Sequence, residues 1–239
     1  MTNINRRHPL YAAALAISLL GGCALPPGKQ ATMAEPSALS ADSQSNTIDL
    51  SLVTVRLPYD KAKTRIQYGW FYEYGKEVTW PNDSLPVSRR DIEEAFRQAL
   101  GPLNYKFPKP STSVFESRLG EGADLLLGAV VTEREANLCF PLSGSSNLSF
   151  GNINSAKGST YLQITWEVFS VIERRVVFKT TTEGAFQTGT SIVDGEKVMT
   201  LNAFKASLLG LAADPKFKEL ILRRQIPPPS SDTARPSQT

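Results

Sequence analysis

The sequence predicts an α+β domain in which a mostly antiparallel sheet is covered by two or three helices. Two observations carry this prediction: runs in which apolar and polar residues alternate, and stripes of apolar residues spaced three and four positions apart. The first pattern is typical of half-buried strands and the second of amphipathic helices. Each helical stripe can cover one face of a sheet, so we expect α+β rather than a doubly wound parallel sheet.

The clearest strand lies in the second half of the chain. Leu162, Ile164, Trp166 and Val168 fall on one face, while the polar residues between them fall on the other. An apolar run beginning at Ala123 is expected to form a central strand. The remaining strands are expected at 175–182, after a tight turn at 172–174, and in an earlier pair at 48–57 and 64–74.

The helices are predicted from their ends. Ser88 and Asp91 form a capping arrangement before the first helix, and Gly101-Pro102 ends it. Thr200 is expected to cap a second helix. Asp214-Pro215 is expected to restart a short third one, since proline suits the first helical position. The apolar stripes are Ile92, Ala95, Phe96, Ala99 and Leu100, then Leu201, Phe204, Leu208 and Leu211, then Phe217, Leu220 and Ile221.

The N-terminus carries an export signal. The apolar run Leu10–Gly22 is shorter than the roughly 20 residues that a membrane-spanning helix needs. Gly21 and Gly22 precede Cys23, and Leu20 stands three positions before that cysteine. The stretch resembles the lipobox of bacterial lipoproteins. The resemblance implies a diacylglyceryl thioether on Cys23, cleavage before it, and acylation of the new amine with a fatty acid such as palmitate. Ordinary secretion with a buried cysteine is the alternative.

Lipidation would fix where the protein resides. Two or three acyl chains hold a protein on a membrane almost permanently, whereas one chain binds reversibly. Ala24, and not aspartate, follows Cys23. In enterobacterial lipoproteins this pattern implies export to the outer membrane. We therefore expect a membrane-anchored protein of the bacterial cell envelope that faces the periplasm.

Composition divides the chain into four parts. The segment after Cys23 is rich in Ala, Ser, Pro and Gln without aromatic residues, and the C-terminal segment is rich in Pro and Ser. Neither has the apolar residues needed to form a core. The expected parts are a signal peptide at 1–22, the lipidated cysteine and a flexible tether at 23–47, the α+β domain at 48–224 and a disordered tail at 225–239.

Charge and histidine content exclude several functions. The whole chain has 26 basic and 23 acidic residues, but Arg6 and Arg7 lie in the signal peptide, so the mature chain is nearly neutral. A nucleic-acid-binding footprint is absent. The single histidine, His8, would also be removed, which excludes histidine-dependent catalysis and histidine zinc sites in the mature chain. We expect no enzyme activity, no cofactor and no metal.

Two residue sets are candidates for binding or chemistry. An aromatic row on the second strand, followed by Trp80, could stack on glycan sugars or anchor a partner, although packing under a helix is the favoured interpretation. Glu133 and Glu135 share a strand face, where paired carboxylates could serve acid–base chemistry. A solvated sheet face is the favoured interpretation of that pair. The aromatic row consists of Tyr68, Trp70, Tyr72 and Tyr74, in register with Ile66.

A loop and a cysteine complete the candidates. The Gly-, Ser- and Asn-rich loop 141–159 carries Leu148, Phe150 and Ile153 as its sizeable apolar residues, so it either contacts a partner or is disordered. Cys139 is left alone once Cys23 is lipidated. We expect it to be a buried small hydrophobic residue, with a reactive or intermolecular thiol as the alternative.

The globular part resembles known envelope domains. The order of strands, helix, strands and closing helix, with "ADLLLGAVV" entering the central strand, resembles the periplasmic lipoproteins around the CsgG, YajG and TolB N-terminal folds. The same strand followed by "GSTYLQITWEVFSVIERRVVFKTTTEG" resembles an uncharacterised domain found ahead of some bacterial trypsin-like peptidases. These resemblances imply a fold and an envelope setting. They transfer no active site, because the mature chain has no catalytic histidine.

Together these patterns predict a non-enzymatic binding or assembly component of an envelope complex. Its partners would be the membrane, through Cys23, and another envelope protein or further copies of itself. Two alternatives stay open at this point. One is an accessory or regulatory subunit of an envelope enzyme such as a peptidase, and the other is a module that binds peptidoglycan or another glycan.

Overall fold

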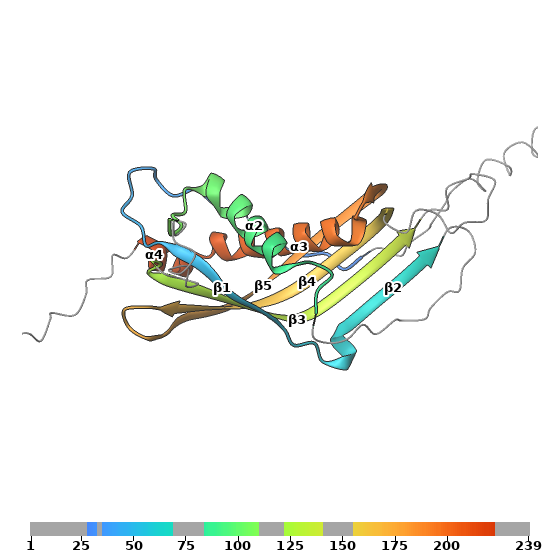
Figure 1. Cartoon of the computed structure of the whole chain (residues 1–239), viewed down its shortest axis with the longest axis horizontal. Coiled ribbons are helices and arrows are strands. Elements are labelled where there is room, and N and C mark those ends of the chain that lie inside the picture. The colour runs from blue at the N-terminus through green and yellow to red at the C-terminus, as the bar shows by residue number, and fades with distance from the viewer. Residues whose placement is uncertain (1–27, 33–34, 69–83, 110–121, 141–154, 223–239) are drawn as a thin grey trace, which may run out of the picture.

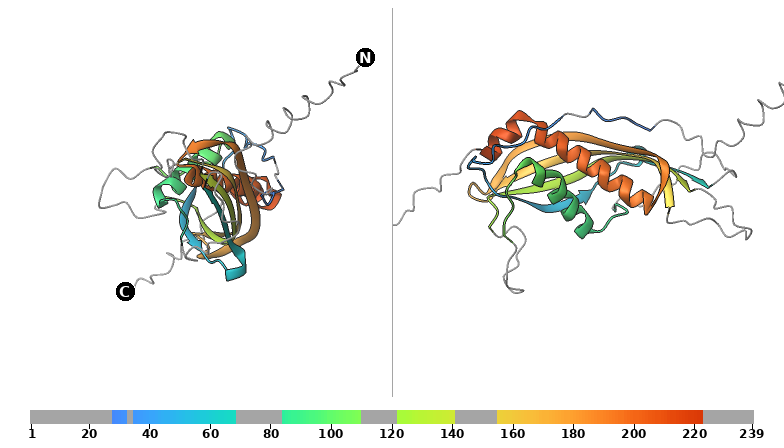
Figure 2. Two further views of the ribbon diagram at one scale, coloured as in Figure 1. Left: turned by 90° about the vertical axis from the view of Figure 1, so that its right-hand side faces the viewer. Right: turned by 90° about the horizontal axis from the view of Figure 1, so that it is seen from above.

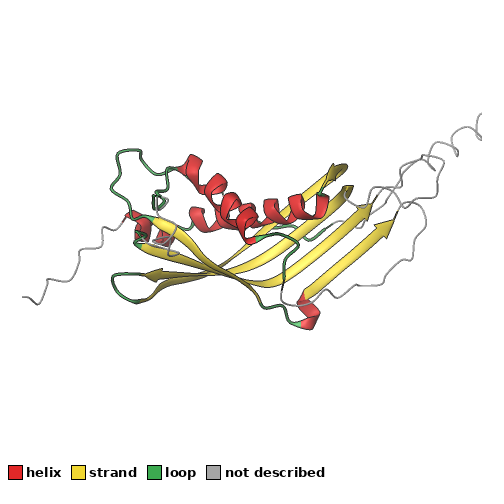
Figure 3. Cartoon of the chain, viewed as in Figure 1, coloured by secondary structure: helices red, strands yellow, loops and turns green. Residues whose placement is uncertain are grey.

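The computed structural model describes residues 28–32, 35–68, 84–109, 122–140 and 155–222. These residues form one sheet with helices on one of its faces (Figure 1; Figure 3). None of the helices in these ranges is long and apolar enough to span a membrane. The elements are β1 (Ile48–Val55), η2 (Tyr59–Lys61), β2 (Ala62–Tyr68), α2 (Arg89–Leu100), η3 (Gly101–Leu103), β3 (Leu125–Phe140), β4 (Ser155–Ser170), β5 (Arg175–Val193), α3 (Gly195–Ala213) and α4 (Pro215–Leu222).

The central strand β3 organises the sheet and confirms the predicted α+β class. It pairs with β4 in antiparallel orientation, and β4 pairs with β5 in the same way. On its other edge β3 pairs first with β1 and then with β2, and both of these strands run parallel to it. β1 and β2 run parallel to β3, so this part of the sheet is not a simple antiparallel meander. A parallel pair needs a crossover connection, and the chain passes through α2 between β2 and β3.

Alternation along the strands separates an apolar face from a polar face. Trp166 on β4 points toward the helices, as expected, and lies 5.7 Å from the Phe204 ring of α3, measured between ring centroids. Its indole nitrogen donates a hydrogen bond to Thr182 Oγ1 at 2.8 Å. Burying each large apolar side chain of this kind contributes roughly 1.5–3 kcal/mol. The residues that β3 and β4 contribute to this core are Leu125, Leu127, Ala129, Val131, Leu162, Ile164, Trp166 and Val168.

Helix α2 begins and ends where the sequence predicts. The Ser88 side chain accepts a hydrogen bond from the Asp91 amide, and the Asp91 carboxylate accepts one from the Ser88 amide. The helix buries Ile92, Ala95, Phe96 and Leu100 and passes at Gly101 into η3. Asp91 also pairs with Lys197 of α3 at 2.7 Å, so the N-termini of the two helices are joined. Hydrogen bonds from Lys197 and Ser88 lower the pKa of Asp91 to about 2.

Helix α3 begins at Gly195, and the prediction that Thr200 caps it is wrong. Thr200 lies within the helix and is buried. Two features explain why the helix begins before Thr200. Met199 continues the buried stripe of the helix. Gly195 approaches the carbonyl of Ala156 so closely that a Cβ on residue 195 would lie 2.4 Å from the carbonyl oxygen. The predicted restart at Pro215 is confirmed by α4, where the Asp214 carboxylate accepts a hydrogen bond from the Lys216 amide at 2.8 Å.

A buried ion pair fixes the start of α3 to the sheet. Arg134 on β3 faces the helix side and donates to Glu196 Oε1 from Nη2 at 2.7 Å. Its side chain is 4% exposed. Removing one partner of such a pair leaves a buried charge without compensation, which costs far more than a surface pair contributes. The pair therefore sets the position of α3 relative to β3.

Part of the segment expected to be a flexible tether contacts the domain. Leu39 is buried in the core, and its amide donates to the Leu103 carbonyl at 3.0 Å. Asn104 returns a hydrogen bond to the Leu39 carbonyl at 2.8 Å. Further along, the Asn46 amide donates to the carbonyl of Ile221 at the end of α4. Residues 35–47 thus join the end of the molecule that carries η3 and α4.

Replacing Gly184 with alanine should destabilise the domain. A Cβ at Gly184 of β5 would lie 2.0 Å from the Ala203 carbonyl oxygen and 2.4 Å from the Ser207 amide nitrogen of α3. Overpacking costs about 1–3 kcal/mol, and two backbone clashes favour the upper part of that range. Gly189→Ala on the same strand is the matched control, since no described atom lies within 4 Å of its Cβ. Urea unfolding that gives equal stabilities for both variants would contradict the predicted contact.

Candidate functional site

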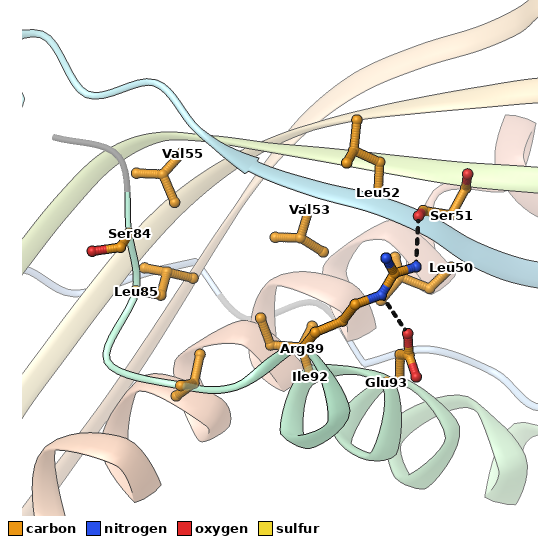
Figure 4. A pocket seen from close by; sticks show the side chains of 11 residues that line it. Leu50, Ser51, Leu52, Val53, Val55, Ser84, Leu85, Arg89, Ile92 and Glu93 are labelled. Atoms are coloured by element: carbon orange, nitrogen blue, oxygen red, sulfur yellow. Dashed lines mark hydrogen bonds and ion pairs between the residues drawn. The ribbon is translucent and has the colours of Figure 1, made fainter. Parts of the chain in front are cut away.

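A groove lies between β1 and α2 (Figure 4). Its volume is about 250 Å³, which is smaller than the roughly 300–1,000 Å³ of pockets that bind drug-sized ligands. One wall comes from β1, the other from the first turn of α2 and the residues before it. The lining residues are Leu50, Ser51, Leu52, Val53, Val55, Ser84, Leu85, Val87, Arg89, Ile92 and Glu93.

The groove follows an open strand edge. Within the described ranges β1 pairs with β3 alone, so its outer edge faces the groove. The register shifts between Leu50 and Leu52, which makes a bulge at Ser51. Arg89 Nη2 donates to the Ser51 carbonyl at 3.2 Å, while Arg89 Nε donates to Glu93 at 2.8 Å. The bond to Ser51 holds Arg89 at the bulge. Beyond the bulge, no described strand pairs with the outer edge of β1.

The chemistry of the groove suits an apolar side chain. Leu52 is 59% exposed and adds apolar area to the lining of the groove. The charged groups of the rim, Arg89 and Glu93, pair with each other instead of pointing charge into the hollow. In the ranges that the structure covers, no group of three or more His, Cys, Asp or Glu side chains is arranged to hold a metal ion. The groove therefore offers apolar contact area.

A second feature lies on the sheet face opposite the helices. There the chain at Gly28 to Gln30 docks onto β3 and β4. Lys29 Nζ lies 2.7 Å from Glu133 Oε1 and 4.1 Å from the centroid of the Tyr161 ring. The backbone of Gly28 lies so close to Ser159 that a Cβ would approach its Oγ to 2.2 Å. The docking contact therefore consists of an ion pair beside a position that only glycine fits.

The charges of this docking contact stabilise one another. Burial alone would raise the pKa of Glu133, but the hydrogen bond and charge of Lys29, with Lys61 at 3.5 Å, outweigh it and lower that pKa. Burial likewise opposes the charge on Lys29, yet the hydrogen bond to Glu133 raises its pKa. Burial raises the pKa of the Tyr161 hydroxyl to about 12. At neutral pH the contact consists of an ammonium, a carboxylate and a neutral phenol.

The two predicted carboxylates do not form a cleft. Glu133 is 13% exposed at its side chain and pairs with Lys29 and Lys61, so it is less solvated than the favoured interpretation assumed. Glu135 accepts a hydrogen bond from Asn137 at 3.4 Å. Because its pKa is lowered, Glu133 is ionised at neutral pH and is a poor proton donor. Glu133 serves the docking contact, and the groove lies elsewhere.

Most other predicted site residues lie outside the described ranges. Tyr68 is the last residue of β2, and of its neighbours in the aromatic row only Ile66 is described, on the same strand. The other predicted residues outside these ranges are Cys23, Trp70, Tyr72, Tyr74, Trp80, Leu148, Phe150 and Ile153.

Cys139 differs from its prediction in one respect. It is fully buried, as expected, but the structure records it as disulfide-bonded and not as a lone thiol. Cys139 lies two residues beyond Asn137, on the sheet face where Gly28 docks. The other cysteine of the sequence is Cys23.

The groove was not predicted, although the sequence of β1 carries a signal for it. Apolar residues alternate in one phase through Ile48, Leu50 and Leu52 and in the opposite phase through Val53 and Val55. A change of phase within a strand is typical of a bulge. Such a bulge turns an apolar side chain outward, and here it exposes Leu52.

Comparisons with known proteins found similarity in shape alone. No family model and no curated protein sequence matches the chain. A Xanthomonas campestris protein of the DUF330 family is 12% identical, with a TM-score of 0.37, covering 82% of this chain and 96% of that one. A Paraburkholderia phytofirmans PelC dodecamer subunit is 13% identical (TM-score 0.34, 77% and 98% covered). The LpoB C-terminal domain from Salmonella enterica is 15% identical (TM-score 0.18, 62% and 87%). Likeness at this level assigns no function.

The docking contact should weaken in acid. Since the pKa of Glu133 is lowered in the folded protein, its contribution is complete above the ordinary value of 4.5 and is lost as the pH falls through the lower folded value. In an NMR titration, the amide signals of Lys29 and Tyr161 should move with a midpoint below 4.5. Glu133→Gln should abolish that transition. A midpoint at or above 4.5 in the unsubstituted protein would contradict the ion pair.

Proposed function

We propose that this chain is a lipid-anchored protein of the bacterial outer membrane that faces the periplasm and binds a partner protein without catalysing a reaction. The anchoring part rests on the lipobox ending in Cys23. The binding part rests on the apolar groove beside the open edge of β1. The mature sequence would contain no histidine, which excludes catalysis that depends on an imidazole.

The proposed occupant of the groove is an extended segment of a partner envelope protein. Such a segment can hydrogen-bond to the edge of β1 beyond Ser51 while placing one apolar side chain beside Val53 and Ile92 (Figure 4). Backbone pairing supplies part of the affinity and the groove selects the side chain. The volume of the groove allows one or two side chains and no larger body.

The membrane anchor makes so small a contact sufficient. Burying one or two apolar side chains contributes roughly 1.5–3 kcal/mol each, which is modest against the cost of association. Confinement of both partners to one surface raises their effective concentration. Tethering, rather than a large interface, would then determine how often the two proteins meet.

Lipidation at Cys23 has a direct test. Mass spectrometry of the N-terminal peptide from membranes should show residue 23 as the first residue, carrying a diacylglyceryl group and an acylated amine. A chain that retains residue 1, or a Cys23 held in a disulfide without lipid, would overturn the anchoring proposal. Treatment with a reductant before analysis separates these outcomes, because a thioether resists reduction.

Leu52→Glu should remove partner binding without unfolding the domain. Leu52 is 59% exposed, so a carboxylate there stays solvated in the free protein and is buried only when a partner enters the groove. Val176→Glu is the matched control, since Val176 is 47% exposed on β5, at the opposite edge of the sheet from β1. In cross-linked envelope fractions captured through a C-terminal tag, a stoichiometric partner should be lost with Leu52→Glu and kept with Val176→Glu.

Other results of that experiment favour other functions. A partner kept by both variants would exclude the groove as the binding site. Absence of any partner, together with retention of the unsubstituted protein on purified peptidoglycan, would favour a glycan-binding module. A partner that proves to be an envelope enzyme, whose activity changes on binding, would make the chain a regulatory subunit.

A further inference from the structure

The docking of residues 28–30 determines how the domain sits on a membrane. We infer that the end of the sheet where β2 and β3 finish and β4 begins lies against the lipid bilayer, and that Lys29 and Gly28 hold it there. The inference rests on the proposed lipid anchor at Cys23. It goes beyond that proposal because an anchor alone sets neither the orientation nor the distance of a domain.

The first step is the place where the chain is fixed. Lys29 is bound by Glu133 on β3 at 2.7 Å and lies over the Tyr161 ring of β4. Gly28 contacts Ser159, near the start of β4. Ser159 is the fifth residue of β4, which begins at the end of the sheet where β3 finishes, whereas Glu133 lies near the middle of β3. Gly28, the described residue nearest the lipid attachment, is therefore closer to this end of the sheet than to the other.

The second step is the length of chain that remains. Only residues 24–27 separate the lipidated Cys23 from Gly28. Fully extended, the chain from Cys23 to Gly28 reaches at most about 18 Å. The turn between β4 and β5 lies at the opposite end of the sheet (Figure 1; Figure 2). Gly28 lies at Ser159, which pairs with Gln187 of β5, and β5 begins at Arg175, so the turn is about 40 Å from Gly28 along the sheet. A tether so short keeps the near end at the bilayer and the far end away from it.

The third step is the charge of the surface that would meet the lipid. β2 finishes at the proposed membrane end, and its exposed face carries Lys63 and Arg65. The strand contains no acidic residue. Anionic headgroups attract basic side chains near a bilayer. The basic residues of β2 therefore favour the same orientation of the domain on the membrane as the tether does.

Fluorescence energy transfer to the bilayer tests the orientation. The probes are single cysteines at Val193, at the end of β5, and at Val171, in the β4–β5 turn. Both valines are exposed, and Cys139→Ala prevents competing labelling. The lipidated protein is labelled and placed on vesicles of phosphatidylethanolamine and phosphatidylglycerol with an acceptor dye on the headgroups. Transfer should be severalfold greater from position 193 than from position 171.

An undocked variant tests the cause. Gly28→Val with Lys29→Glu adds a clash with Ser159 and places two carboxylates together. The next fixed residue is then Leu39, at the other end of the molecule, and the tether of residues 23–38 can reach about 55 Å. The difference between the two positions should disappear or reverse. Lys216→Glu, an exposed lysine on α4, is the control that should keep it. Circular dichroism checks that each variant is folded.

The outcomes separate this inference from the proposed anchor. A chain without lipid, seen by mass and by failure to bind vesicles, overturns the anchor. A lipidated chain that binds vesicles but gives equal transfer from positions 193 and 171 overturns the orientation. A difference that survives in the undocked variant shows that Lys29 and Gly28 do not cause it, and overturns the inference in that respect.

Discussion

The alternation of β3 is the constraint on which the rest of the structure depends. This strand pairs with β1, β2 and β4, so each of its side chains must point either toward the helices or away from them. Toward the helices it presents Leu125, Leu127 and Val131, which form the core with α3. Away from them it presents Glu133, which fixes the N-terminal segment. One strand thus serves stability on one face and attachment on the other.

The two faces divide the proposed roles between them. The groove is built from the edge strand β1 and from α2, on the helix side of the sheet. The docking contact uses the opposite face, where β3 and β4 are polar. A partner in the groove and a membrane at the end of the sheet would not compete for the same surface. This separation is what an anchored binding protein requires, because the anchor must not block the partner.

Local signals were read correctly from the sequence, and long-range ones were not. The cap at Ser88 and the alternation around Trp166 depend on neighbouring residues, and both were predicted. Strand direction was not predictable, since the period of two is the same for parallel and antiparallel pairing. Thr200 has the residue type of a cap, but the contact of Gly195 with Ala156 decides where α3 begins. The Lys29–Glu133 pair joins residues 104 positions apart, and no local pattern marks it.

The adjacency of Glu133 and Arg134 on β3 has a mechanical consequence. Glu133 holds Lys29 on one face, and Arg134 holds Glu196 of α3 on the other. Lys197, next along α3, holds Asp91 at the start of α2, which forms a wall of the groove. Tension on the N-terminal segment would pass through β3 and the start of α3 to α2. The N-terminal segment and the wall of the groove are therefore linked through one continuous path of ion pairs.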